Sequence, residues 1–195
     1  STGQPKGIIQ THRNIHHRVM IDTNNFHICP DDRLSLISSP TYSVSLRNLF
    51  GALLNGATLF PFNIKDEGII RLAEWFNQQL ITIYFSVPSV FRQFASSLGE
   101  TTPLKTLRLI YLGGDTVTKR DVQLYKDHFS QNALLVNSLA ANETGQIRNY
   151  FIDNNTLIKF DLVPAGYELE GKKIALLDDA GGEVPCGQIG EIAIK

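Results

Sequence analysis

One carboxylate and one glycine-containing loop are the features of this sequence best suited to chemistry. Glu143 closely follows the apolar run of residues 134–136, which is typical of a buried strand. A carboxylate just beyond the carboxyl end of a parallel strand lies where α/β sheets bind ligands. The first seven residues, STGQPKG, offer backbone N–H groups, two hydroxyls and Lys6 to phosphate oxygens. Together the two segments predict a site for a nucleoside triphosphate with magnesium.

Each of these signals alone has a plainer interpretation. STGQPKG lacks the GxxxxGK[ST] pattern of a Walker loop, and segments rich in Gly, Ser and Pro are usually connecting loops. Glu143 would also serve as a charge at a helix N-terminus. His12 and His16 have a spacing that can bind a metal, but no third ligand is evident, so exposed or capping histidines are the simpler interpretation. Cys29 and Cys186 have no metal-binding spacing and are predicted to be reduced thiols.

The composition is that of a globular protein. Of the 195 residues, 43% are apolar and 19% charged, enough for a core in one large domain or two small ones. The net charge of -1 gives no electrostatic reason to expect nucleic acid or an anionic membrane as a partner. No apolar run approaches the roughly 20 residues of a membrane span and no signal peptide is visible, so we expect a cytoplasmic protein. The chain starts without Met and stops inside the alternating segment GEIAIK, so we expect a piece of a longer protein.

Strand-like and helix-like segments alternate through residues 1–150. The predicted strands are residues 7–10, 33–39, 57–62, 81–85, 107–112 and the segment that begins at 134. The predicted helices are residues 11–25, 44–54, 67–79, 88–98 and 118–129, and three of them have start signals at Thr11, Pro88 and Thr118. This alternation predicts an α/β fold, a mostly parallel sheet with helices on both faces.

The pattern changes after about residue 150. Helical periodicity ends, and residues 157–163, 172–178 and 189–195 look like strands joined by glycine turns. We therefore predict an α/β subdomain over residues 1–150, followed by the incomplete start of a β-rich subdomain over residues 151–195.

Five stretches of the sequence occur in the order in which one enzyme superfamily has them. They are STGQPKG followed by His12, LFGALLNGATLFP, YLGGD, NSLAANETGQI and VPAGYELEGKKIALLDDAGGEVPCGQIGEIAIK. Over nearly its whole length the chain resembles the adenylate-forming superfamily, which includes acyl-CoA and aryl-CoA ligases, luciferases and the adenylation domains of nonribosomal peptide synthetases. LFGALLNGATL is especially similar to the peptide-synthetase adenylation domains.

The resemblance implies an acid–thiol ligase, or AMP-forming synthetase. Such an enzyme joins a small carboxylic acid to ATP, with Mg2+, to give an acyl-adenylate and pyrophosphate. It then transfers the acyl group to a thiol, either of CoA or of the phosphopantetheine of a carrier protein. The superfamily's ribose-binding aspartate and its small C-terminal domain with a catalytic lysine would follow Lys195, so we expect the isolated chain to be inactive.

The resemblance also assigns nucleotide-binding roles within residues 1–150. The implied catalytic residues are Glu143 on magnesium, Asn142 at the α-phosphate and Lys6 in the phosphate loop. The implied nucleotide-binding residues are Ser1, Thr2, Gly3, Lys6, Gly113, Gly114, Asp115, Asn137, Leu139 and Asn142. Attack on the α-phosphorus builds up negative charge on phosphate oxygens. A divalent ion and fixed hydrogen-bond donors stabilise this charge.

Departures from the superfamily pattern surround Glu143. Leu139 replaces an aromatic residue that usually packs on adenine, Ala140-Ala141 replaces glycine-proline, and Asn142 replaces threonine. These changes leave open a second interpretation, a degenerate member that is a non-catalytic binding or scaffold domain. A third, a generic flavodoxin-like nucleotide binder, does not explain the matching tail after residue 150.

The same resemblance assigns the acid-binding residues. They are Ser43, Val44, Arg47, Phe85, Tyr111, Gly113, Ser138, Gln146 and Ile147, of which Phe85 and Ile147 would equally well be plain core residues. Ser43 occupies the position of the aspartate that pairs with the ammonium group of α-amino acids, and Arg47 would face the same pocket. We therefore expect an aryl, fatty, hydroxy or keto acid instead of an ordinary α-amino acid.

Overall fold

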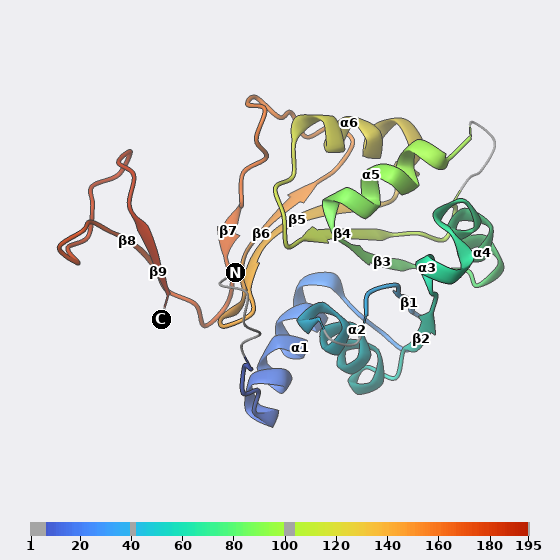
Figure 1. Cartoon of the computed structure of the whole chain (residues 1–195), viewed down its shortest axis with the longest axis horizontal. Coiled ribbons are helices and arrows are strands. Elements are labelled where there is room, and N and C mark those ends of the chain that lie inside the picture. The colour runs from blue at the N-terminus through green and yellow to red at the C-terminus, as the bar shows by residue number, and fades with distance from the viewer. Residues whose placement is uncertain (1–6, 40–41, 100–103, 195) are drawn as a thin grey trace.

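A seven-stranded sheet runs through the described part of the protein, a computed structural model that describes residues 7–39, 42–99 and 104–194 (Figure 1). The strands lie in the order β2-β1-β3-β4-β5-β6-β7. Their bounds are β1 Arg33–Leu36, β2 Thr58–Pro61, β3 Ile83–Ser86, β4 Leu109–Gly113, β5 Leu134–Ala141, β6 Gly145–Ile152 and β7 Tyr167–Glu168. Strands β1 to β5 are mutually parallel, whereas β6 and β7 are antiparallel to their neighbours. This arrangement confirms the predicted fold class.

Helices cover both faces of this sheet, as expected. Helices α1 and α2 lie on one face and α5 and α6 on the other, while α3, η1 and α4 lie near the β2 end (Figure 1). The bounds are α1 His12–Phe26, α2 Ser43–Leu54, α3 Ile64–Glu67, η1 Ile69–Arg71, α4 Leu72–Gln78, α5 Pro88–Ser97 and α6 Lys119–His128.

Side chains of the central strands contribute alternately to two separate hydrophobic cores, because successive residues of a strand point to opposite faces of the sheet. Ile83 and Phe85 of β3 pack with Tyr111 of β4 in the core beneath α1 and α2. Tyr84 of β3 and Ile110 of β4 belong to the larger core beneath α4, α5 and α6. The site residues predicted on β3 and β4 therefore lie on the α1–α2 side of the sheet.

Local capping chemistry starts the helices where the sequence predicts. Thr11 caps α1 and Thr118 caps α6, each through a capping box, and Pro88 is the first residue of α5. Asp121 of the α6 box also accepts hydrogen bonds from Arg92 of α5 at 2.6 and 2.8 Å. The same carboxylate thus caps one helix and joins it to the next.

The C-terminal end of α1 is tied to the start of the sheet by Arg108, which directly precedes β4. Its guanidinium donates to the carbonyl oxygens of Phe26 and His27 at 2.9 and 3.2 Å. It also donates to both carboxylate oxygens of Asp32, at 2.9 and 2.6 Å. Basic side chains that bind the last carbonyls of a helix stabilise that end.

Three predicted elements differ in the structure. Residues 7–10 form no strand. The predicted helix at 67–79 is divided into α3, η1 and α4, because Gly68 adopts φ 81° and interrupts the helical path. Residues 157–163 are irregular apart from a bridge between Leu162 and Thr118, since they run along the start of α6 instead of pairing with a strand.

The last two strands form a sheet of their own. Strands β8 (Ile174–Leu177) and β9 (Glu191–Ile194) pair as an antiparallel hairpin that projects from the main sheet (Figure 1). They match the strands predicted at 172–178 and 189–195. No helix among the described residues is long and apolar enough to cross a membrane.

Candidate functional site

Glu143 lies in the turn that joins β5 to β6. Residues 142–144 form this turn, and both Asn142 and Glu143 are exposed. Because β5 is parallel to β4, the turn lies beyond the carboxyl end of a parallel strand. Since the chain continues as strand β6, Glu143 is not at a helix N-terminus, which removes that alternative.

The first turn of α2 meets this β5–β6 turn. The Ser43 hydroxyl donates to Asn142 Oδ1 at 2.7 Å, although the two residues are 99 positions apart. The Asn142 side-chain nitrogen makes no hydrogen bond to another residue in the described part of the chain, so its two N–H donors remain free. The structure thus brings a residue assigned to the acid together with one assigned to the nucleotide.

Residues 113–115 lie at the same end of the sheet. Gly113 pairs with Ser138 across β4 and β5, and a Cβ added to Gly113 would lie 3.1 Å from the Tyr111 ring. Gly114 follows with φ +84°, and Asp115 is exposed. The glycine at 113 therefore allows Tyr111 to pack closely against the strand end.

Asn137 and Leu139 lie on β5. Asn137 is 7% exposed, and its amide donates to the carbonyl oxygens of Val163 and Pro164 at 3.4 and 2.9 Å. Leu139 is half-buried. The Asn137 side chain therefore holds the loop at residues 163–164 against the sheet. Ser1, Thr2, Gly3 and Lys6 lie outside the described residues.

A buried ion pair lies among the residues assigned to the acid. Arg47 of α2 donates from Nε and Nη2 to the two carboxylate oxygens of Asp22 on α1, the second bond measuring 2.7 Å. Side-chain exposures of 4% and 1% place both groups out of water. With its amide nitrogen facing Asp22, Gln146 of β6 hydrogen-bonds both partners at 2.8 Å.

The Arg47 guanidinium stacks on the aromatic residues predicted to surround the acid. It lies 3.8 Å from the ring centre of Tyr111 and 4.8 Å from that of Phe85, so it covers both rings. Val44 is half-buried and Ile147 buried, while the Ser138 hydroxyl is buried with no hydrogen-bond partner in the described part of the chain. Ser138 thus contributes a buried hydroxyl whose hydrogen-bonding capacity is unused in the described part of the chain.

Burial governs the protonation of this ion pair. Burial raises the pKa of the Asp22 carboxyl, and the charge and hydrogen bonds of Arg47 oppose that rise. Burial alone would lower the pKa of Arg47, but the charge and hydrogen bonds of Asp22 together with the interactions of Tyr111 outweigh it and raise the pKa. The expectation that Arg47 repels a cation is therefore modified, because Asp22 offsets its charge.

Sequence reasoning missed Asp22, although a signal was present. Val19, Asp22 and Phe26 follow helical spacing on the buried face of α1. An acid on an apolar helix face needs a cationic partner, because an isolated buried carboxylate is costly.

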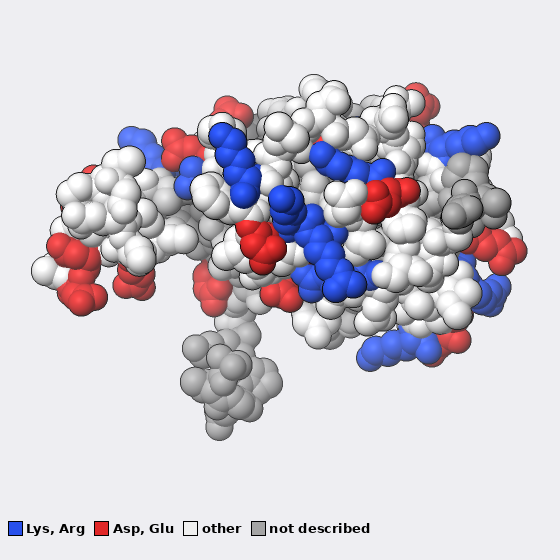
Figure 2. All heavy atoms as spheres, turned by 90° about the horizontal axis from the view of Figure 1, so that it is seen from above, with Lys and Arg blue, Asp and Glu red and all other residues white. Residues whose placement is uncertain are grey.

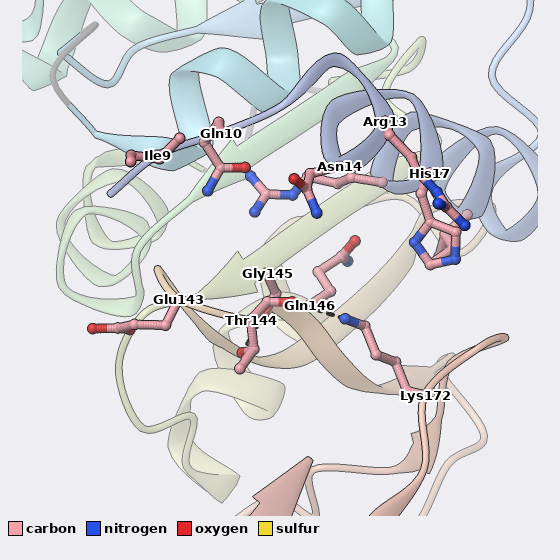
Figure 3. Close-up of a pocket in the computed structure, with 12 residues that line it drawn as sticks. Ile9, Gln10, Arg13, Asn14, His17, Glu143, Thr144, Gly145, Gln146 and Lys172 are labelled. Atoms are coloured by element: carbon pink, nitrogen blue, oxygen red, sulfur yellow. Dashed lines mark hydrogen bonds between the residues drawn. The ribbon is translucent and has the colours of Figure 1, made fainter. Parts of the chain in front are cut away.

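A cavity of about 320 Å³ opens between α1, the β5–β6 turn and Lys172 (Figure 3). Gln146, one of the residues assigned to the acid, lines it together with Glu143 and Arg18. A smaller cavity of about 20 Å³ shares Arg18 with it and adds Ser43 and Arg47. Phe85 and Tyr111 line neither of these cavities.

The donor set suits magnesium better than a metal held by protein ligands alone. The described residues contain no group of three or more His, Cys, Asp or Glu side chains that could hold a metal, so His12 and His16 find no third ligand there. Mg2+ is usually bound by one or two carboxylates together with substrate phosphates. The exposed Glu143 at the strand end fits that requirement.

The family of the chain follows from its sequence. All of residues 1–195 match the family model described as AMP-binding enzyme. The chain belongs to the AMP-binding enzyme family. This confirms the resemblance to the adenylate-forming superfamily.

Proteins similar to this chain include synthetases that are much longer than it. Bacitracin synthase 3 of Bacillus licheniformis is 29% identical over the whole chain, and malpibaldin synthetase of Mortierella alpina is 30% identical. The chain spans only 3% of the length of each of these two relatives.

Two structures of Klebsiella oxytoca NpsA share the fold. The NpsA N-terminal subdomain in complex with 3-hydroxybenzoyl-AMSN is 24% identical with a TM-score of 0.82, and the match covers all of this chain and 49% of that one. NpsA-ThdA, an artificially fused adenylation–PCP di-domain, has the same identity and TM-score, with 38% of that chain covered.

Proposed function

We propose that this chain forms the ATP- and acid-binding part of an adenylate-forming enzyme of the peptide-synthetase type. The hydrogen bond between Ser43 and Asn142 carries this proposal. It joins the helix assigned to the acid to the turn that carries Glu143, so the two substrates would meet at one strand end. Ligand sites of open α/β sheets lie at this end of the strands.

In the proposed reaction, a carboxylate oxygen of the acid attacks the α-phosphorus of ATP, and the bond to pyrophosphate breaks. The Asn142 amide donates to the α-phosphate, and Glu143 holds the magnesium ion together with the phosphates. Magnesium, when bound, neutralises charge on phosphate oxygens. Lys6 and the loop of Ser1, Thr2 and Gly3 serve the β- and γ-phosphates. Asn137, Leu139 and residues 113–115 position the nucleoside.

A thiol then completes the reaction. Its sulfur attacks the acyl carbonyl carbon, the thiol proton leaves, and AMP departs to give a thioester. The peptide-synthetase relatives and the NpsA fusion to a PCP domain favour phosphopantetheine on a carrier protein, with CoA as the other acceptor. We place this activity in the cytoplasm and in a longer protein, and propose that residues 1–195 alone do not turn over.

The acid is proposed to lack an α-ammonium group. Ser43 carries no charge, and the nearby buried carboxylate of Asp22 is already engaged by Arg47. The free hydroxyl of buried Ser138 suits an acid with a polar substituent, such as a hydroxy or keto acid. A panel of acids in pyrophosphate exchange tests this. Robust exchange with a common α-amino acid and none with other acids would refute it.

The reaction is tested by acid-dependent exchange of pyrophosphate into ATP in the longer protein. Glu143→Ala should reduce exchange at least about 100-fold, since it removes the metal ligand. Glu170→Ala removes another exposed acid, outside the site, and should leave exchange unchanged. Equal activity of both variants would contradict the proposal.

A non-catalytic binding domain is the second candidate. The Arg47 guanidinium covers Phe85 and Tyr111, two residues assigned to the acid, and thereby favours it. ATP binding without exchange for any acid, in the longer protein with Glu143 intact, would support this candidate over the enzyme.

A further inference from the structure

Large apolar side chains lie outside the core in the segment that joins β6 to β7. Leu157, Phe160 and Leu162 are 82%, 75% and 62% exposed. Apolar side chains exposed singly are common on protein surfaces, whereas neighbouring ones mark interaction sites. We call these three side chains the outward patch.

The fold does not need the outward patch, because other residues of the same segment fill the core. Ile158 packs against the core beneath α4, α5 and α6, and Val163 is buried in it. The segment is therefore two-sided: one set of apolar side chains belongs to the core, and the outward patch is left in solvent.

The segment is held in place at both ends along α6 (Figure 1). At one end, Lys126 of α6 donates from Nζ to the carbonyl oxygen of Thr156 at 2.8 Å. At the other, the backbone N–H of Lys119 donates to the carbonyl oxygen of Asp161 at 2.7 Å. A surface that is already ordered loses less conformational entropy when a partner binds it.

Two charges of opposite sign alternate with the apolar side chains. Lys159 and Asp161 flank Phe160, and both are exposed. Neither side chain makes a hydrogen bond or an ion pair in the described part of the chain. One positive and one negative charge favour neither an acidic nor a basic partner.

A second copy of the chain does match this pattern. If two copies of the segment meet antiparallel about a two-fold axis, with Phe160 facing Phe160, Lys159 of each copy lies opposite the partner's Asp161. The wider face on the α6 side agrees with this, since Figure 2 shows Lys and Arg interspersed there with Asp and Glu. A face of one sign would instead repel its own copy.

We propose that the outward patch joins two copies of this chain, with Phe160 at the centre and the Lys159–Asp161 pairs at the rim. The apolar area is small, so we expect a weak dimer with a Kd of roughly 10–100 µM. The proposal does not rest on the adenylation activity. Because α6 and α1 lie on opposite faces of the sheet, the dimer leaves the residues assigned to the acid uncovered (Figure 1).

The test is sedimentation velocity of the purified 195-residue chain at concentrations up to about 500 µM. We expect a shift from monomer to dimer as the concentration rises. Phe160→Asp should raise the Kd at least about tenfold, because it places a charge at the apolar centre. Ile70→Asp is the matched control, since Ile70 is an apolar residue of η1 that is 79% exposed. A wild-type chain that stays monomeric, or an equal loss in the control, would overturn the proposal.

Charge reversal tests the two-fold arrangement. Lys159→Asp and Asp161→Lys should each weaken self-association several-fold, because like charges then face each other. Mixed in equal amounts, the two variants should associate again, since each supplies the charge that the other lacks. Mixing does not repair a folding defect, so this recovery separates the contact from a loss of structure. No recovery on mixing would refute the arrangement, and circular dichroism establishes that each variant is folded.

Discussion

Arg47 is tolerated in the interior because Asp22 is buried with it. Removing water from a guanidinium costs several kcal/mol, and only a close carboxylate with further hydrogen bonds offsets this. Tyr111, Phe85 and Gln146 complete the environment of the pair. Each side chain of the pair therefore stabilises the other in the interior, and removing either one leaves a buried charge without a counter-ion.

Asp22→Asn should destabilise the chain by roughly 3–5 kcal/mol, because it leaves Arg47 buried without a counter-ion. Urea denaturation measures this change in the free energy of unfolding. Asp31→Asn, at an exposed position, is the control and should change stability by less than about 0.5 kcal/mol. The double variant Asp22→Leu with Arg47→Met should recover most of the loss, and its failure to do so would contradict the assignment.

Asp32 should make stability depend on acid pH. Burial alone would raise its pKa, but hydrogen bonds from Arg108, Thr82 and the backbone N–H of Cys29 lower it below the ordinary 3.8. A carboxyl group with a lowered folded pKa contributes stability that is present above pH 3.8 and is lost as the pH falls through the folded pKa. Asp32→Asn should therefore be less stable than the wild type at neutral pH, with a gap that narrows in acid.

Urea denaturation at pH values above and below about 4 checks this dependence. A gap between the two proteins that stays constant across that range would show that Asp32 does not titrate as described.

The sequence was least informative about contacts between individual side chains. Glu143 could be placed at a strand end because its position depends on local order along the chain. The Asp22–Arg47 pair depends on how α1 packs against α2, 25 residues later in the sequence. The hydrogen bond between Ser43 and Asn142 likewise exists only once α2 is docked on the sheet.

At the scale of elements, one glycine is required by a close backbone approach. Gly166 has φ +84°, and a Cβ there would lie 2.0 Å from the carbonyl oxygen of Asn149 on β6. Gly68 has a similar φ of +81° but nothing within 4 Å of its Cβ position. A substitution at Gly68 therefore measures the cost of the backbone conformation alone, whereas one at Gly166 adds a steric clash with β6.

Gly68→Ala should cost about 1–3 kcal/mol, the cost of holding alanine in a glycine-favoured conformation. Gly166→Ala should cost more than about 4 kcal/mol, because β7 must also move away from β6. Thermal unfolding of both variants provides the comparison. Equal losses would contradict the close approach of Gly166 to β6.

Helices α1, α2, α5 and α6 and the five parallel strands β1 to β5 were predictable because their signals are local. Thr11, Pro88 and Thr118 start helices by satisfying or removing end N–H groups, and each does so where expected. Strand β6 and its antiparallel direction were not predicted, since both depend on the tight turn at 142–144 returning the chain along β5. Residues 157–163 misled because apolar residues recur there as in a strand, but Leu157, Phe160 and Leu162 are exposed and the segment pairs with no strand.

At the scale of the molecule, stability should be distributed unevenly. The central strands β3 and β4 are almost entirely buried, whereas no residue of β8 or β9 is. A lone two-stranded hairpin is marginally stable. Its backbone amides should therefore exchange with deuterium much faster than those of β3 and β4 in hydrogen-exchange mass spectrometry, and comparable protection would contradict this.

Domain organisation was predicted from a change in pattern near residue 150. The main sheet continues past that point through β6 and β7, and the separate hairpin begins with β8. The division into residues 1–150 and 151–195 remains a prediction about folding units, which limited proteolysis of the chain addresses.

Helix α1 is held by hydrogen bonds at its C-terminal end, and residues toward its N-terminal end line the cavity. Arg108 clamps the carbonyls of Phe26 and His27, while Arg13, His17 and Arg18 lie toward the opposite end. At 15 residues the helix is about 22 Å long, so a pivot of a few degrees about the clamp displaces its far end by roughly 2 Å. Any small change in the angle of α1 about this anchored end would therefore change the width of the cavity mouth more than it would move the residues that Arg108 holds.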